Sequence, residues 1–175
     1  MITNASPLII FGKVNQLDLL TKIFEKIVIS RAVYQEVVEK GSTVNAPDAL
    51  LVGEYVKSGL IEIKELKEEW RDKASLFQKI YTQLDLGEAE TIALALQEKE
   101  KSVLIDERIA RRIAKLYNLE PIGSLKVLLM AYMSNIISEE KLRIILSEIT
   151  STKFRLSAEI MNKFWMLFEK LKNKS

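Results

Sequence analysis

Polar side chains that can bind a cation follow the short apolar segments of this 175-residue chain. The residues directly after these segments are Asn4 and Ser6, Ser30, Asp106 and Glu107, and Gly123 and Ser124. Three more acidic residues, Glu36, Glu88 and Glu90, lie near the starts of predicted helices. Carboxylate and amide oxygens are the ligands that Mg²⁺ and Mn²⁺ prefer. Carboxylates that gather in one place repel each other unless a cation joins them or one holds a proton.

Each acidic residue also has an ordinary structural explanation. Asp106 stands where an N-cap is expected. Glu88 and Glu90 lie in a first helical turn, where the helix dipole favours negative charge. Residues two apart on a helix are separated by a rotation of about 200°. Glu88 therefore shares the core side with Ile92, and Glu90 is expected to point toward water.

The composition excludes several kinds of site. The chain has no cysteine and no histidine, so disulfides, thiolate ligands, serine–histidine triads and histidine–zinc sites are all excluded. Catalysis must then use carboxylates, lysines, hydroxyls or a hard metal held by oxygen. The 26 basic and 24 acidic residues nearly balance, but residues 151–175 contain six basic residues and two acidic ones. A basic end of this kind suits either a polyanionic partner or a solvated final helix.

Hydrophobic patterning predicts an α/β fold. Short apolar strands are expected at residues 1–3, 27–29, 60–63, 103–105 and 121–122. A helix is expected at residues 7–24 with Ser6 as its N-cap, and another at residues 31–39 that ends at Gly41. Asp106 is expected to be the N-cap of a helix that follows it directly. The other expected helices are at residues 49–56, 66–84 (one helix or two), 88–98, 125–133, 139–149 and 156–171. Strands that alternate with helices indicate a parallel sheet covered on both faces. Ligands bind such sheets outside the carboxyl ends of the strands, where the polar residues above are placed.

The chain has no visible targeting or membrane segment. Its first residues lack a basic region, and residues 8–11 form too short an apolar run for a signal. No apolar run approaches the roughly 20 residues of a spanning helix. We expect a cytoplasmic protein that does not contact membrane.

Four segments resemble the PIN-domain nucleases when they are taken in order. They are Asn4-Ala5-Ser6-Pro7-Leu8-Ile9, Val33-Tyr34-Gln35-Glu36-Val37, Leu86-Gly87-Glu88-Ala89-Glu90-Thr91-Ile92-Ala93-Leu94-Ala95, and Val103-Leu104-Ile105-Asp106-Glu107-Arg108. More narrowly, they are similar to a prokaryotic subfamily of predicted nucleic-acid-binding PIN proteins. Its members often carry Ser-Pro-Leu after the first strand and Gly-Ser or Gly-Thr near position 123. The resemblance covers about residues 1–135.

The resemblance implies a three-layer α/β/α, Rossmann-like domain with a short central parallel sheet over residues 1–135. Residues 136–175 would add a C-terminal helical extension packed on that domain. PIN proteins bind Mg²⁺ or Mn²⁺ in an acidic pocket and cleave single-stranded or structured RNA. Many are toxins of toxin–antitoxin pairs, so the resemblance also implies a homodimer and an antitoxin protein as partners.

Carried over by position, the resemblance assigns roles to single residues. The metal ligands fall on Asn4, Glu36, Glu88 and Asp106, and the last three are the catalytic acids. Accessory positions fall on Ser6, Glu90, Glu107 and Ser124. Basic residues predicted to grip RNA phosphates at the rim are Arg108, Arg111, Arg112 and Lys126, although each also suits a solvated helix surface.

One position departs from the family pattern. The first acidic position is usually aspartate, and here it is Asn4. An amide oxygen can coordinate a hard cation but brings no charge, so the substitution weakens metal binding. A second hypothesis is therefore a catalytically weakened module that binds nucleic acid or protein. A phosphotransfer domain with Asp106 as nucleophile fits less well, because the first strand lacks acidic neighbours.

Overall fold

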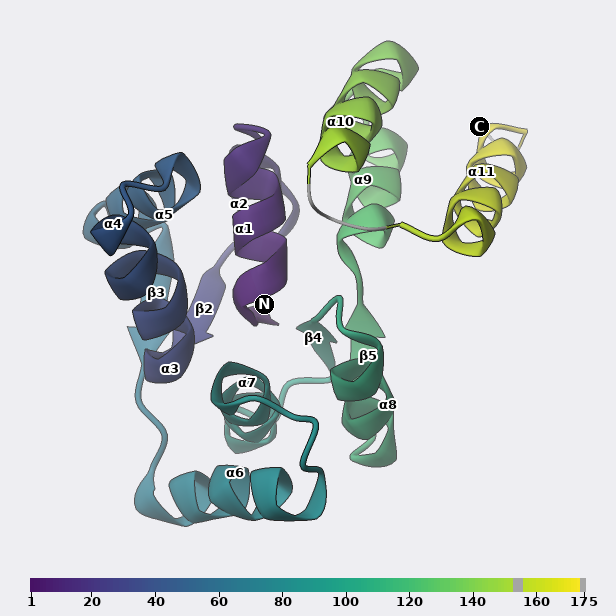
Figure 1. Ribbon diagram of the computed structural model, residues 1–175. Coiled ribbons are helices and arrows are strands. Elements are labelled where there is room, and N and C mark those ends of the chain that lie inside the picture. Colours follow the sequence, from purple (N-terminus) through teal and green to yellow (C-terminus); the bar gives the residue numbers. More distant parts are fainter. Residues whose placement is uncertain (153–155, 174–175) are drawn as a thin grey trace.

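A sheet of five parallel strands forms the centre of the computed structural model, which describes residues 1–152 and 156–173 (Figure 1). The strands are β1 (Ile2–Thr3), β2 (Ile27–Ser30), β3 (Ile61–Lys64), β4 (Ser102–Leu104) and β5 (Glu120–Ile122). Their order across the sheet is β3-β2-β1-β4-β5. Ile2 of β1 is in register with Val28 of β2 and with Val103 of β4. The predicted parallel sheet and three-layer α/β/α fold are confirmed.

Helices cover both faces of the sheet. Six lie mainly on one face: α1 (Ala5–Lys13), α2 (Asp18–Ile23), α5 (Pro47–Lys57), α9 (Ser124–Met133), α10 (Glu139–Ser151) and α11 (Ala158–Lys172). The other face packs against α6 (Glu68–Ile80), α7 (Leu86–Gln97) and α8 (Arg108–Leu116). Figure 1 shows α6 and α7 on the side of the sheet opposite α1 and α9. No helix among the described residues is long and apolar enough to cross a bilayer.

The strand sequences suit this sandwich because their side chains alternate between two cores. Ile27 and Ile29 of β2 belong to the core beneath α1, whereas Val28 belongs to the core against α7. All three are buried, so the strands read as continuous apolar runs. Burial on both faces fixes the register of each strand, and the register fixes which residues emerge at its carboxyl end.

The first two helical regions differ from expectation. The helix predicted over residues 7–24 is two helices, α1 and α2, because the chain turns at Asn15, which has a φ of 50°. The N-cap of α1 is Asn4 rather than Ser6. Gly41 does not end the next helix. That helix runs from α3 (Arg31–Tyr34) through a π-helical segment, η1 (Gln35–Lys40), into α4 (Gly41–Thr43).

The other helix boundaries differ from the predicted ones by a few residues. The helix or helices expected at 66–84 form one shorter helix, α6, which ends at Ile80. The C-terminal helices share the core beneath α1, since Leu142 of α10 and Phe168 of α11 join it. The proposed boundary between residues 135 and 136 stays a prediction, and residues 153–155, 174 and 175 of the second segment lie outside the described part of the chain.

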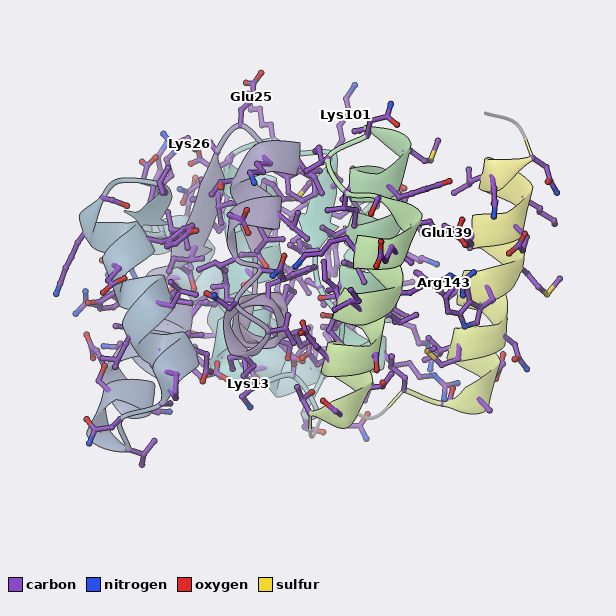
Figure 2. All side chains as sticks on the ribbon, turned by 90° about the horizontal axis from the view of Figure 1, so that it is seen from above. Lys13, Glu25, Lys26, Lys101, Glu139 and Arg143 are labelled. Atoms are coloured by element: carbon purple, nitrogen blue, oxygen red, sulfur yellow. The ribbon has the colours of Figure 1, made fainter. Side chains whose placement is uncertain are left out.

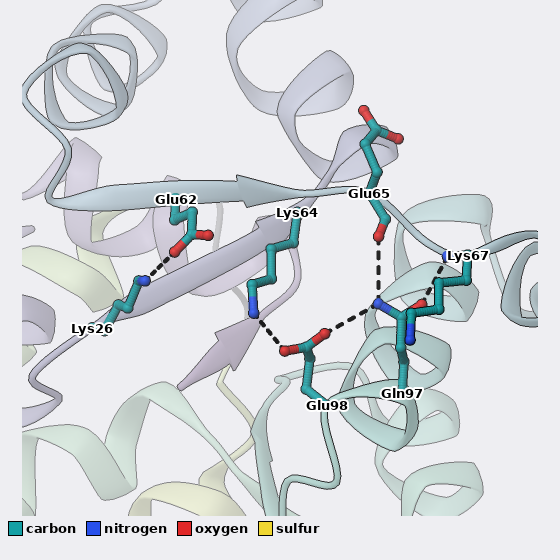
Figure 3. Close-up of polar contacts among 7 residues, drawn as sticks. All are labelled: Lys26, Glu62, Lys64, Glu65, Lys67, Gln97 and Glu98. Carbon is teal, nitrogen blue, oxygen red and sulfur yellow. Dashed lines mark hydrogen bonds and ion pairs between the residues drawn. The ribbon is translucent and has the colours of Figure 1, made fainter.

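Ion pairs and hydrogen bonds hold the β3 edge of the sheet to α7. Lys64 Nζ lies 2.5 Å from Glu98 Oε2, and Lys26 pairs with Glu62 (Figure 3). Gln97 accepts a hydrogen bond from the backbone N–H of Lys67 at 2.8 Å. We call these five side chains, Lys26, Glu62, Lys64, Gln97 and Glu98, the β3 edge network. Every carboxylate in it has a lysine partner.

Candidate functional site

The strand order creates a switch point between β1 and β4. From β1 the chain moves outward through β2 to β3, and then crosses back to place β4 on the other side of β1. Such a reversal leaves a crevice at the carboxyl ends of the two strands concerned. Asn4 follows β1, and Asp106 and Glu107 follow β4 at this crevice.

Asp106 and Glu107 turn toward opposite neighbours of β4. Glu107 faces the end of β1, where it accepts hydrogen bonds from Asn4 Nδ2 at 2.5 Å and from Ser6 Oγ. Asp106 faces the end of β5, where it accepts from Ser124 N at 2.8 Å and from Ser124 Oγ at 2.5 Å. The two adjacent acids therefore link three strand ends.

Two of the expected local roles are wrong. Asp106 does not cap the helix that follows it, because Glu107 holds the N-cap position of α8. Asp106 instead accepts from the first residue of α9, the helix after β5. Ser6 was expected to cap α1, but its hydroxyl donates to Glu107. Both side chains thus form hydrogen bonds between the ends of different strands instead of capping their own helices.

Asn4 places an unpaired oxygen in this crevice. The side chain is only 3% exposed, and Nδ2 is used by Glu107. Its Oδ1 is buried and has no hydrogen-bond partner among residues 1–152 and 156–173. A buried acceptor without a partner costs about 1–3 kcal/mol. A cation or a donor that reaches this oxygen would recover that free energy.

A second acidic group forms where α3–η1 meets α7. Glu36 lies on η1 and directs Oε2 toward Gly87, where an added Cβ would come within 2.9 Å of that oxygen. Asp85 caps α7 by accepting from the N–H of Glu88 at 2.7 Å, and Glu88 accepts from the N–H of Asp85 at 3.0 Å. This reciprocal capping box is encoded by the Asp-Leu-Gly-Glu spacing, which is the signal that identifies Asp85. Sequence reasoning missed Asp85.

Burial and neighbouring acids raise the pKa values of Glu88 and Glu36. Burial raises the pKa of Glu88 to about 7, and the charges of Asp85, Glu107 and Glu36 add to this, against the hydrogen bond from Asp85 N–H. Burial also raises the pKa of Glu36, with Asp85 adding to the shift and Lys40 opposing it. At full ionisation the cluster would hold uncompensated negative charge, which a cation would relieve.

Asp106 belongs to the same electrostatic unit. Burial raises its pKa, the hydrogen bonds from Ser124 oppose that rise, and the charge of Glu107 reinforces it. Glu107 therefore acts on Glu36, Glu88 and Asp106 alike. It was predicted as an accessory position, and the structure gives it the most central place. We call Glu36, Asp85, Glu88, Asp106 and Glu107 the strand-end cluster.

Glu90 lies outside this cluster. Its Oε2 accepts from the N–H of Ala32 at 3.0 Å and so ties α7 to the first turn of α3. Glu90 is more exposed than the buried Glu88, as expected, and the start of α3 supplies a donor to its carboxylate. Ser30 caps the same helix, as expected, by accepting from Val33 N.

The four predicted phosphate-binding residues occupy three different places. Arg111 lies beside Asp106 and donates from Nη1 to the carbonyl of Ile105 at 2.8 Å. Lys126 lines the same hollow as Asp106 and pairs with Glu120 at 2.7 Å. Arg112 lines a separate hollow between α6 and α8. Arg108 is exposed and acts electrostatically on Glu159 of α11. Arg111 and Lys126 are therefore the two that adjoin the acids.

The donor chemistry suits a hard divalent cation. Carboxylates and an amide oxygen are the right ligands, and Asn4 Oδ1 is free to accept one. As the side chains stand, no three acidic groups in the described ranges, 1–152 and 156–173, are close enough to enclose an ion. Glu107 is held by Asn4 and Ser6 instead. Binding would require these hydrogen bonds to rearrange.

Comparison with protein-family models identifies a family. A protein-family model described as a PIN domain matches residues 1–170. A search among curated proteins gave no match. The matched span includes every member of the strand-end cluster, all of α10, and α11 as far as residue 170.

Proposed function

The chain belongs to the PIN-domain family, whose members are generally nucleases, and on that premise we propose that it is a metal-dependent endoribonuclease. One observation carries the proposal. Glu36 and Glu88 lie where η1 meets the start of α7, Asp106 and Glu107 follow β4 beside the unpaired amide oxygen of Asn4, and the charge of Glu107 raises the pKa values of Glu36, Glu88 and Asp106. A structural role alone would favour pairing these acids with bases or keeping them apart.

PIN domains typically use divalent metals, and the proposed ligands here are Glu36, Glu88, Asp106 and Glu107, with Asn4 Oδ1 as a neutral fifth. When bound, Mg²⁺ or Mn²⁺ supplies a Lewis acid that lowers the pKa of water and offsets charge on the phosphate. Glu88, whose pKa is about 7, holds a proton in part of the metal-free molecules at neutral pH. Metal binding would release that proton, so affinity should rise with pH up to about 7.

The neighbouring bases suit substrate binding. Arg111 is anchored to the Ile105 carbonyl and has guanidinium donors left beside Asp106. Lys126 reaches the same hollow from α9. These cations would hold the phosphates on either side of the scissile bond and orient the strand against the carboxylates.

Asn4 favours a second candidate function, a weakened module that binds RNA without cutting it. The amide gives the crevice one charge fewer than an aspartate would. It also donates to Glu107, which removes an acidic oxygen from metal binding. The two candidates predict the same RNA contacts and differ in turnover.

The test is cleavage of single-stranded RNA by the purified chain with Mg²⁺ or Mn²⁺, compared with EDTA. We expect metal-dependent cleavage that Glu107→Gln lowers by a hundredfold or more, since lost metal stabilisation is worth several kcal/mol. Glu98→Gln in the β3 edge network is the matched control and should retain activity. Thermal melting with Mn²⁺ gives a second readout, because a ligand of the folded state raises the melting temperature.

The outcomes separate the candidates. Absence of both metal-dependent cleavage and Mn²⁺ stabilisation would contradict the nuclease. RNA binding without cleavage, with turnover gained by Asn4→Asp, would support the weakened module. A toxin role, an antitoxin partner, a homodimer, a cytoplasmic location and the Ser-Pro-Leu subfamily stay predictions from the resemblance.

A further inference from the structure

A groove leads from Asp106 along α9 to α11. Its first part is a hollow of about 260 Å³ that has Asp106 at one end, and its second part, of about 260 Å³ as well, has Leu167 at the other. The two parts share their lining, because the same four side chains border both. These are Arg111, Leu125, Lys126 and Ile160. We call this continuous depression the α9–α11 groove.

The outer wall of the groove is α11, which is fixed by contacts on its other sides. Phe168 packs against Tyr132 of α9 with ring centroids 5.0 Å apart. Arg143 of α10 lies over the ring of Trp165, 4.6 Å from its centroid, and Lys172 pairs with Glu139. Figure 2 shows Glu139 and Arg143 between α10 and α11. The attachment of α11 therefore does not depend on Ile160 and Leu167, two of the side chains that it presents to the groove.

Two of the side chains that α11 presents to the groove are apolar and open to solvent. Ile160 is 46% exposed and Leu167 is 52% exposed. Exposed aliphatic side chains next to each other gain free energy when an apolar surface covers them, at about 25 cal/mol per Å². The groove thus offers binding energy to a ligand with flat apolar faces.

Cations from three helices border the same groove. Arg111 comes from α8, Lys126 from α9 and Lys163 from α11. Lys126 pairs with Glu120 and Lys163 pairs with Glu159 at 2.5 Å, both on the exposed surface. Exposed pairs of this kind contribute about 0–1 kcal/mol, so a phosphate can replace the glutamate at little cost. The charge suits a polyanion that runs the length of the groove.

We propose that the α9–α11 groove holds the single-stranded RNA that flanks the scissile phosphate. The inference rests on the proposed function, because a strand cut at the strand-end cluster must pass Asp106, where the groove begins. Unpaired bases expose faces that pack on Ile160 and Leu167, while the phosphates reach the three cations. A duplex hides its base faces, so the apolar wall would add nothing to its binding.

The experiment measures binding apart from cleavage. A fluorescent oligouridylate of about 12 nucleotides is titrated with the full chain in EDTA at several salt concentrations. The charge variant is Lys126→Ala/Lys163→Ala, and its matched control is Lys13→Ala/Lys101→Ala, at exposed lysines that lie away from the groove (Figure 2). The apolar variant is Leu167→Asp, and its control is Met166→Asp, at a neighbour that is 61% exposed.

The proposal expects both groove variants to bind the oligouridylate about tenfold more weakly than their controls. Loss of two phosphate contacts should also lower the slope of log K against log salt by about 1.4. Turnover of bis(p-nitrophenyl) phosphate by the parent chain with Mn²⁺ reports on the strand-end cluster separately, because that diester is too small to reach Ile160 and Leu167.

Equal binding by the groove variants and their controls would overturn the proposal and leave the groove to another occupant, such as an acidic peptide. Equal dependence on the groove for an RNA duplex would overturn the single-strand assignment. If the parent chain turns over neither the small diester nor RNA, the proposed nuclease fails, while binding in EDTA still decides the groove.

Discussion

The β3 edge network and the strand-end cluster both contain glutamates and lie in the same α/β layer structure, but only the network contains lysines. In the network, Lys64 donates to Glu98 and this hydrogen bond lowers the pKa of that carboxyl (Figure 3). In the cluster, burial raises the pKa of Glu88 to about 7 and neighbouring acids add to the shift. Within the described ranges, none of the cluster's carboxylates forms a salt bridge.

The β3 edge network and the strand-end cluster differ in their position relative to the sheet. The network sits on the outer edge, where long lysine side chains reach carboxylates across water-exposed surface. The cluster lies at the strand ends and the start of α7, and the Arg111 Nη1 beside Asp106 donates to the carbonyl of Ile105. Charge that is paired stabilises a surface modestly, whereas charge that is left unpaired in a crevice is available to a ligand.

The largest expected effect is on catalysis. Asp106→Asn should lower Mn²⁺-dependent cleavage of single-stranded RNA by a hundredfold or more, because it removes a charged ligand from the cluster. The asparagine oxygen can still accept from Ser124, so the fold should persist. Initial rates at saturating metal make the measurement. Cleavage by the variant at the parent's rate would show that Asp106 has no role in cleavage and that the strand-end cluster is structural, like the β3 edge network.

The next effect tests the amide at the switch point. Asn4→Asp replaces the donor that Glu107 accepts with a second carboxylate. Without metal, the variant should lose about 1–3 kcal/mol of unfolding free energy, since a buried hydrogen bond becomes a repulsion. Mn²⁺ should then raise its melting temperature more than that of the parent. Thermal melts with EDTA and with Mn²⁺ measure both, and an unchanged melt in EDTA would contradict the prediction.

A smaller effect is expected on the pH dependence of stability, and it distinguishes the strand-end cluster from the β3 edge network. The unfolded chain releases the Glu88 proton near pH 4.5 and the folded chain near pH 7. The folded state thus binds more protons between these values, and metal-free stability falls as pH rises through them. Glu88→Gln keeps the capping acceptor and removes this loss, so it should add about 2 kcal/mol above pH 7 and nothing below pH 4.5.

Urea unfolding at several pH values with EDTA measures this difference. Glu54→Gln, at an exposed position on α5, is the control and should follow the parent. If Glu88→Gln and the parent lose stability in parallel between pH 4.5 and 7, the burial of Glu88 does not govern that loss.

Much of the fold was predictable because the strands are short, buried and apolar on both faces. Two strands are recognisable from their β-branched residues, Ile27-Val28-Ile29 and Val103-Leu104-Ile105. The alternation of strands and helices along the chain predicts the parallel sheet. The helix ends were less predictable. Nothing in the residues around Gly41 indicates a π-helix, because the extra turn arises from packing against α5 and not from local preference.

The sequence predicts that the site lies at the strand ends, but it does not predict which side chains form hydrogen bonds with each other there. Asn4 and Asp106 were placed correctly because they follow β1 and β4. The order β3-β2-β1-β4-β5 decides that Glu107 turns toward Asn4, and sequence spacing does not contain that order. The hydrogen bond between Glu90 and Ala32 could not be predicted for the same reason, since the two residues lie 58 positions apart.

The smallest expected effect belongs to the β3 edge network. A double-mutant cycle of Lys64→Met and Glu98→Gln should give a coupling of about 0.2–1 kcal/mol, because both side chains are partly exposed and the pair is solvated. The coupling should shrink in about 1 M salt, where the screening length is near 3 Å. Since the pKa of Glu98 is lowered, its contribution should also disappear as pH falls below that pKa. Chemical unfolding of the four proteins supplies the cycle. A coupling above about 2 kcal/mol that resists salt would mean that the edge network is desolvated like the strand-end cluster, and exposure would no longer separate the two regions.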